Sequence, residues 1–183
     1  MIINNTNIEG VVELVRKPIQ DGRGLFERIY CQDVLQNYLH YSSITQINHS
    51  LTTAKGTVRG FHMQLGDSAE YKIVSCISGK VCDVAVDLRR NSKTFLKWCS
   101  VTLSPQKYNS FLIPPGVAHG FQCIEDNSEL LYFHTANYSP KDEFGVSYQD
   151  PKLCIDWPLL PTQVSDRDLS FKNLSNDFLG FDL

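Results

Sequence analysis

The sequence lacks any excess of positive charge. Its 183 residues include 17 Lys and Arg against 20 Asp and Glu, which gives a formal net charge of −3, and the pI is about 5.9. Proteins that bind nucleic acids or anionic membranes present basic patches. This composition argues against both classes of partner, so any anionic ligand must be bound by a few individually placed arginine or lysine side chains.

The chain also lacks CxxC pairs and long apolar runs, and we expect it to have no secretion signal. Several of its six cysteines lie within apolar, strand-like stretches, so we interpret them as buried, reduced thiols rather than zinc ligands. No apolar run approaches the ~20 residues that span a bilayer. The N-terminal MIINNTNIEG has neither a basic nor an apolar signal region. We therefore expect a soluble, cytoplasmic protein.

Short strand-like segments fill most of the chain. One or two strands are expected in 1–17 and another in 25–31, with a turn cluster at 18–24 and a short helix at 32–39. Further strands are expected at 45–51, 57–64, 71–77, 80–88, 95–103, 108–113, 118–124 and 129–137. Evenly spaced short strands separated by turns are typical of a β-sandwich or barrel. We predict one mainly β domain over residues 1–183.

Alternation along the strands predicts which side chains face a ligand. Tyr132 and His134 fall on the same face of the 129–137 strand, and two ring groups with polar tips indicate a ligand-facing surface. Strict alternation places Arg59 and His62 on opposite faces of their strand. If both serve one pocket, the strand must contain a bulge, for which Gly60 between them is the natural position.

Two histidines in strand-rich motifs raise the question of a metal site. His62 and His119 each lie near one end of a strand-like run and have a glycine close by in the sequence, as in the mouth of a β-barrel. A barrel metal site usually combines an HxH pair and a carboxylate with a third histidine, and this chain retains only the third element. Two histidines alone make a weak metal site. We expect no metal and no cofactor, but a polar pocket suited to acid–base chemistry.

Several motifs carry a family resemblance over nearly the whole chain. They are DGRGLF at 21–26, QINHS at 46–50, GTVRGFHMQ at 56–64, YKIVSCISGKVCDVAVDLRRNSKTFLKW at 71–98, LIPPGVAHGFQ at 112–122, LLYFHTANYSP at 130–140, QDPKLCIDWP at 149–158 and SDRD at 165–168. In this order they resemble the dTDP-4-dehydrorhamnose 3,5-epimerase family. The resemblance implies the cupin fold, a double-stranded β-helix or jelly-roll barrel with a few short helices, and cofactor-independent epimerisation of a nucleotide-linked 4-keto-6-deoxy sugar.

The resemblance also implies the catalytic roles. His62 of the RGxH motif matches the base that removes a proton beside the ketone, and Asp168 of SDRD matches its carboxylate partner. Lys72 suits the developing enolate oxygen, and Tyr132 matches the acid that returns a proton on the other face. Each residue read alone would be ordinary core or surface, so these roles depend on the motifs.

Substrate-binding positions follow from the same resemblance: they are Arg23, Gln46, Asn48, Arg59, His119 and Tyr138. The two arginines match residues that bind the diphosphate, and His119 and Tyr138 match residues that line the sugar site. Family members form homodimers that exchange N-terminal strands. Arg23, Gln46 and Asn48 are therefore expected to serve the pocket of the neighbouring subunit.

The chain departs from the family pattern at several positions. Met63 follows the histidine where a tyrosine is typical, and Arg28, beside Glu27, stands where many members place a glutamate that contacts the nucleobase. Further differences lie at Phe133, His134, Ala136 and Asn137. They leave open the nucleobase, the sugar, and whether C3, C5 or both are inverted. Two alternatives are a non-catalytic sugar-nucleotide-binding cupin and a metal-dependent cupin enzyme.

Overall fold

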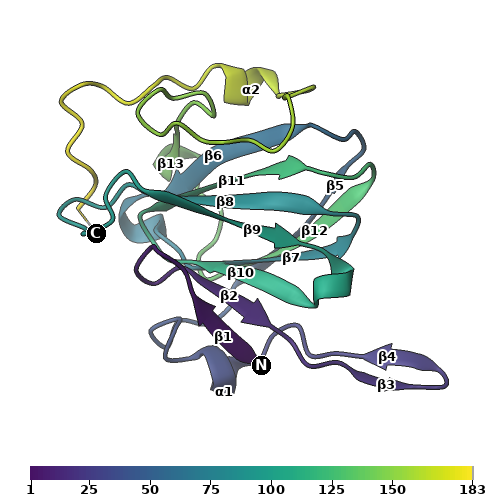
Figure 1. Cartoon of the computed structure of the whole chain (residues 1–183). Helices are drawn as coiled ribbons and strands as arrows, with labels where there is room; N and C mark the ends of the chain where they lie inside the picture. Colours follow the sequence, from purple (N-terminus) through teal and green to yellow (C-terminus); the bar gives the residue numbers. More distant parts are fainter. Residues whose placement is uncertain (183) are drawn as a thin grey trace.

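The computed structural model describes residues 1–182, which form two facing antiparallel sheets and a separate hairpin (Figure 1). The first sheet has the strand order β1 (Ile2–Asn5), β2 (Val12–Val15), β10 (Asn109–Ile113), β7 (Lys72–Ser78), β12 (Ser128–His134) and β5 (Gln46–Thr52). The second has the order β13 (Glu143–Gly145), β6 (Val58–Gln64), β11 (Val117–Cys123), β8 (Val81–Asp87) and β9 (Trp98–Leu103). This arrangement confirms the predicted mainly β, cupin-like jelly roll.

The core lies between the two sheets. Alternate residues of β7 and β10 in one sheet, such as Val74 and Phe111, pack against Val117 and Phe121 of β11 in the other. Burial of such apolar side chains is the main source of stability in a sandwich of this kind. The polar pocket lies directly beside this core, because Phe121 and Tyr132 contribute to both.

The outer faces of both sheets are also covered. The segment after β13, which includes α2 (Asp166–Leu169), packs over the five-stranded sheet, where Phe61, Val84 and Leu174 are buried together (Figure 1). The segment around α1 (Gln32–Leu35) covers the six-stranded sheet in the same way. Strands of the five-stranded sheet are therefore buried on both faces, and the C-terminal segment is positioned to contribute side chains to them.

The N-terminal part differs most from the prediction. The expected turn cluster at 18–24 forms strand β3 (Ile19–Asp21) and the turn into β4 (Gly24–Phe26), and the strand expected at 25–31 ends at Phe26. Figure 1 shows this hairpin extending away from the two sheets. Because Ile19, Leu25 and Phe26 are all exposed, the hairpin has no buried face that alternation along the sequence would reveal. The predicted helix is also shorter, since α1 ends at Leu35.

All eight strands predicted between residues 45 and 137 have counterparts, β5 to β12. Three short 3₁₀ turns connect parts of the chain: η1 (Gly66–Ser68), η2 (Pro105–Lys107) and η3 (Pro140–Asp142). None of the helices within residues 1–182 has the length and apolar character needed to cross a bilayer.

The cysteines are free thiols with different exposures. Cys76, Cys99 and Cys123 are buried, and burial raises the pKa of Cys76 to about 12 and that of Cys99 to about 11. Cys31 and Cys82 are half-buried. Cys154 is exposed in the loop after β13, so the expectation of burial is wrong there. A thiol in an irregular loop lacks the strand context that buries the others.

Candidate active site

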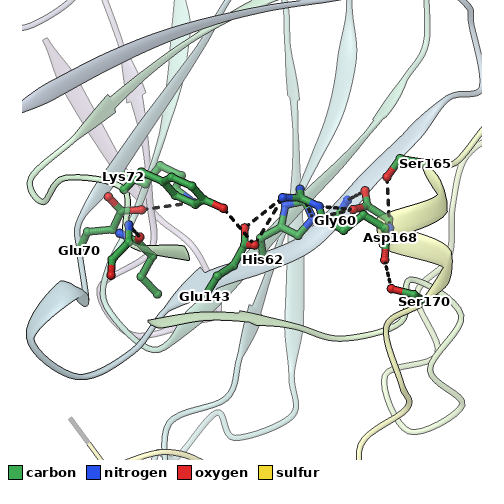
Figure 2. Close-up of polar contacts among 12 residues, drawn as sticks. Gly60, His62, Glu70, Lys72, Glu143, Ser165, Asp168 and Ser170 are labelled. Carbon is green, nitrogen blue, oxygen red and sulfur yellow. Dashed lines mark hydrogen bonds and ion pairs between the residues drawn. The ribbon is translucent and has the colours of Figure 1, made fainter. Parts of the chain in front are cut away.

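An open pocket of about 580 Å³ lies at one end of the barrel, between β5, β7 and β12 of one sheet and β6 and β11 of the other. The predicted site residues that line it are Gln46, Asn48, Arg59, His62, Lys72, His119, Tyr132 and Tyr138. Asp168 reaches the same place from α2 and lies behind His62 (Figure 2). The structure thus brings the imidazole, the ammonium and the phenol of the predicted catalytic set to one cavity.

A bulge in β6 turns Arg59 and His62 toward the same pocket. His62 is opposite His119 on β11, but Arg59 is opposite Phe121, so the register shifts between these pairs. Gly60 lies in the bulge with φ +126°, and a Cβ built there would be 2.5 Å from the Cα of Gly120. Only glycine tolerates both the conformation and this close approach, as predicted from the sequence.

His62 and Asp168 form a hydrogen-bonded pair. Nε2 of His62 is 2.9 Å from Oδ1 of Asp168, and the backbone N–H of Gly60 donates to Oδ2 at 3.0 Å. Ser165, the N-cap of α2, accepts a hydrogen bond from the backbone N–H of Asp168. Helix cap and bulge together fix the carboxylate against the ring (Figure 2).

Asp168 is ionised in this setting. Burial opposes its charge, but the hydrogen bond and charge of His62, the Gly60 N–H and the Arg167 guanidinium outweigh it and lower the pKa of Asp168 to about 2. An ionised carboxylate only accepts hydrogen bonds, so Nε2 of His62 carries the proton and Nδ1 is the basic nitrogen. This tautomer suits the ring for proton abstraction.

Lys72 and Tyr132 lie on the neighbouring strands β7 and β12. Nζ of Lys72 is 3.7 Å from Oε1 of Glu70, a buried residue that the sequence did not single out (Figure 2). The Tyr132 hydroxyl lies 3.3 Å from Oγ of Ser50. Burial raises the pKa of Tyr132, which keeps the phenol protonated and able to donate.

His119 is paired with a carboxylate that sequence reasoning missed. Its Nε2 makes a short contact with Oδ1 of Asp83, and both side chains are buried. Burial lowers the pKa of His119, with further lowering by Lys72 and His62, against the opposing effect of Asp83. A charged residue inside the apolar run KVCDVAV was the available signal. Among residues 1–182, no three His, Cys, Asp or Glu side chains converge as metal ligands would.

Glu143 and Arg167 were also missed. Arg167 Nη1 is 3.3 Å from Oε1 of Glu143, and its Nη2 is 3.1 Å from Nε2 of His62. The Tyr138 hydroxyl donates to Oε2 of Glu143 at 3.3 Å. All three side chains line the mouth of the pocket. Arg167 is the arginine of the SDRD motif, so its place beside Asp168 was the signal.

The residues expected to serve a neighbouring subunit differ in their positions. Gln46 and Asn48 line the pocket of their own chain, so assigning them to the neighbour's pocket is wrong for these two: β5 is paired with β12 of the same sheet. Arg23 does not reach this pocket. It lies on the β3–β4 turn, its side chain is 91% exposed, and within residues 1–182 it bonds only to Asp21. Glu27 pairs with Arg16 at 2.7 Å and is not available to a ligand there.

Arg59 faces the pocket from the bulge. Its Nε donates to Oγ1 of Thr52 at 3.0 Å, and its Nη2 donates to the carbonyl of Leu51 at 3.4 Å. Both acceptors belong to the end of β5, which holds the guanidinium at one side of the cavity. The remaining N–H groups of such a fork can bind an anion.

Fold and pocket together define a cupin equipped for proton transfer. The sequence profile of the dTDP-4-dehydrorhamnose 3,5-epimerase family matches residues 5–176. The dTDP-4-dehydrorhamnose 3,5-epimerase of Escherichia coli K12 is 40% identical over 159 residues, which cover 86% of this chain and 85% of that one. The chain belongs to the dTDP-4-dehydrorhamnose 3,5-epimerase family.

Solved structures agree with this membership. A dTDP-6-deoxy-D-glucose-3,5-epimerase from Legionella pneumophila, in complex with dTDP-4-keto-L-rhamnose, superposes with a TM-score of 0.91 at 35% identity and covers 100% of this chain and 98% of its own. ChmJ, a 3'-monoepimerase from Streptomyces bikiniensis in complex with dTDP-quinovose, gives a TM-score of 0.86 at 25% identity, with 93% and 86% covered. The chain is thus similar both to 3,5-epimerases and to an epimerase that inverts one carbon.

Proposed function

We propose that the protein inverts C3, C5 or both in a nucleotide-linked 4-keto-6-deoxy sugar, without a cofactor, in deoxysugar and polysaccharide biosynthesis. The protein is an isomerase of its family. The observation that carries the proposal is the single pocket that His62, Lys72 and Tyr132 share, with ionised Asp168 behind His62. These are the groups that proton abstraction beside a ketone requires.

The first step is removal of a proton. Nδ1 of His62 takes the proton from the carbon next to the ketone, and the electron pair moves onto the C4 oxygen to form an enolate. Asp168 stabilises the imidazolium that results, because its carboxylate accepts the Nε2–H. The Lys72 ammonium stabilises the negative oxygen.

The second step returns a proton on the opposite face. The Tyr132 phenol donates it, and the raised pKa of Tyr132 keeps the hydroxyl protonated before the reaction. Buried, neutral His119 lines the same wall, where its ring packs edge-on to Tyr132 with centroids 6.2 Å apart. We assign it, with Tyr138, to the sugar site.

The diphosphate is bound by arginine. Arg59 faces the pocket, and its guanidinium forks to phosphate oxygens. A nucleotide-linked sugar is then bound with its diphosphate toward Arg59 and its ring toward His62. Gln46 and Asn48, on the β5 wall, bind the nucleotide part.

We further propose a homodimer in which Arg23 completes the pocket of the partner subunit. The exposed hairpin carries apolar Ile19, Leu25 and Phe26 and the exposed guanidinium of Arg23, which is paired only with the neighbouring Asp21 within residues 1–182, a composition suited to a protein interface. Mixing Arg23→Ala with His62→Asn tests it: the mixture regains exchange, because each mixed dimer contains a pocket with both residues. A mixture as inactive as its components would contradict the shared site.

The central test is deuterium wash-in. The protein is incubated in D₂O with a dTDP-linked 4-keto-6-deoxy sugar, and proton NMR follows the signals of C3 and C5. We expect exchange at one or both carbons, which His62→Asn reduces by about 10²–10⁴-fold. Binding without exchange would identify a sugar-nucleotide-binding cupin, and exchange lost on chelation and restored by metal would identify a metal-dependent enzyme.

We infer one domain over residues 1–183, since the C-terminal segment contributes Asp168 to a pocket built on strands of both sheets. A cytoplasmic location is supported by the free thiols, which suit a reducing compartment.

A further inference from the structure

His134 occupies the pocket wall beside the catalytic groups but has no role in the proposed reaction. It lines the pocket, and 12% of its side chain is exposed. Its ring stacks on that of Tyr132, with centroids 6.1 Å apart and an interplanar angle of 20°. A polar ring confined in this way is placed by its hydrogen bonds rather than by packing alone.

Those hydrogen bonds fix the tautomer of His134. The Nδ2 amide of Asn48 lies 3.4 Å from Nε2 of His134, and the Oδ1 of Asn48 accepts from Nε2 of Gln46, which sets the direction of the amide. Nε2 of His134 is then an acceptor, so Nδ1 carries the proton. Nδ1 donates this proton to Oε2 of Glu70 at 2.9 Å.

Glu70 is therefore shared between two partners. One oxygen takes the hydrogen bond from His134. The other is 3.7 Å from Nζ of Lys72, which is longer than a hydrogen bond; Figure 2 shows Glu70 beside Lys72. The Glu70 side chain is 7% exposed, so its charge must be compensated within the protein. The carboxylate is turned toward the imidazole and only approaches the ammonium.

We propose that His134 is a positioning residue that holds Glu70 away from Lys72. This inference rests on the proposed role of Lys72 at the enolate oxygen. Without the imidazole, the buried carboxylate would close onto the ammonium as a charge-assisted pair at about 2.8 Å. Such a pair would take an N–H group from the substrate oxygen and partly cancel the positive charge that the enolate needs.

The test separates this role from packing. His134→Leu removes the donor but keeps an apolar side chain in the wall. We expect kcat to fall about tenfold, a fraction of the 10²–10³ that loss of an oxyanion donor costs. KM should change by less than about twofold, because the lost interaction forms as the oxygen becomes negative. His134→Gln, which can still donate to Glu70, should retain most of the activity.

The decisive variant is His134→Leu combined with Glu70→Gln. The neutral amide cannot form an ion pair with Lys72, so the double variant should recover to within about threefold of wild type, a strong positive coupling between the two sites. A control is Lys80→Leu, which removes an ion pair with Glu125 outside the pocket. It should leave kcat unchanged.

The outcomes are distinguishable. A wild-type protein without exchange would refute the proposed function itself, and a Lys72→Met variant with full exchange would refute the role of Lys72 on which this inference rests. Wild-type exchange together with a double variant no faster than His134→Leu would refute only the role of His134. Recovery in the double variant, with unchanged thermal unfolding in all variants, supports it.

Discussion

Replacement of Asp168 by asparagine tests the base directly. The carboxylate accepts from His62 with one oxygen and from the Gly60 N–H with the other. An amide can satisfy only one of these donors. If its oxygen faces Gly60, its NH₂ faces Nε2 of His62, which must then accept, and the ring proton moves to Nδ1. If the amide is reversed, its NH₂ meets the Gly60 N–H, and two buried donors oppose each other.

Each orientation has a measurable cost. The first protonates the nitrogen that acts as base, so the deuterium exchange rate should fall by about 10²–10⁴-fold with little change in the affinity for dTDP. The second leaves an unsatisfied buried group, worth about 1–3 kcal/mol of stability. Asp166→Asn, at an exposed position of the same helix, is the control. An Asp168→Asn variant that is both within tenfold of the wild-type exchange rate and as stable as wild type would refute the assignment of Nδ1 as base.

The same residue predicts a pH dependence of stability. Its pKa is lowered from 3.8 to about 2, which corresponds to about 2 kcal/mol of stability in the ionised form. Because the folded-state pKa is the lower one, this stability is complete above the unfolded pKa and is lost as the pH falls through about 2. Urea unfolding at about pH 5 and pH 3 should show about 1 kcal/mol less loss in Asp168→Asn than in wild type.

Three further changes have defined outcomes. Tyr132→Phe should lower the exchange rate about 10²-fold or more while dTDP still binds, as measured by calorimetry; full activity would exclude the phenol as acid. Gly60→Ala should destabilise the protein by about 3 kcal/mol or more, because a Cβ there meets backbone at 2.5 Å with φ +126°, whereas Gly22→Ala, with nothing within 4 Å, should have little effect in thermal unfolding. Arg59→Ala should weaken dTDP binding by about 1.5–3 kcal/mol and reduce its salt dependence; unchanged affinity would place the diphosphate elsewhere.

Much of the barrel could be predicted from the sequence because its strands have one or two buried faces. Alternation or continuous apolar character marks such strands, and glycine or proline marks their ends. Gly60 is the clearest case, because the conflict between alternation and a shared pocket for Arg59 and His62 predicted the bulge. The β3–β4 hairpin could not be predicted in this way, because all residues of its strands are exposed and their sequence shows no alternation between apolar and polar residues.

The catalytic residues were accessible from motifs, whereas their partners were not. Asp83, Glu70 and Glu143 pair with pocket residues far away in the sequence, which are His119, His134 and Arg167 respectively. Nothing in the local sequence around a carboxylate indicates which histidine it will meet across a sheet. Assigning Gln46 and Asn48 to a neighbouring subunit failed for the same reason, because the pairing of β5 with β12 is a long-range property of the sheet.

Three imidazole–carboxylate pairs at the pocket differ in their surroundings, and each has a different part in the proposed proton transfer. The His62 side chain is 22% exposed and its partner is ionised, so this ring can take a proton and meet substrate. His119 is buried and its pKa is lowered, so it stays neutral and adds no positive charge beside the base. His134 donates its Nδ1 proton to Glu70. In the proposed arrangement, Lys72 then keeps its positive charge available for the substrate oxygen. In the proposed reaction the three rings therefore have different parts: His62 takes the proton, His119 stays neutral, and His134 holds Glu70.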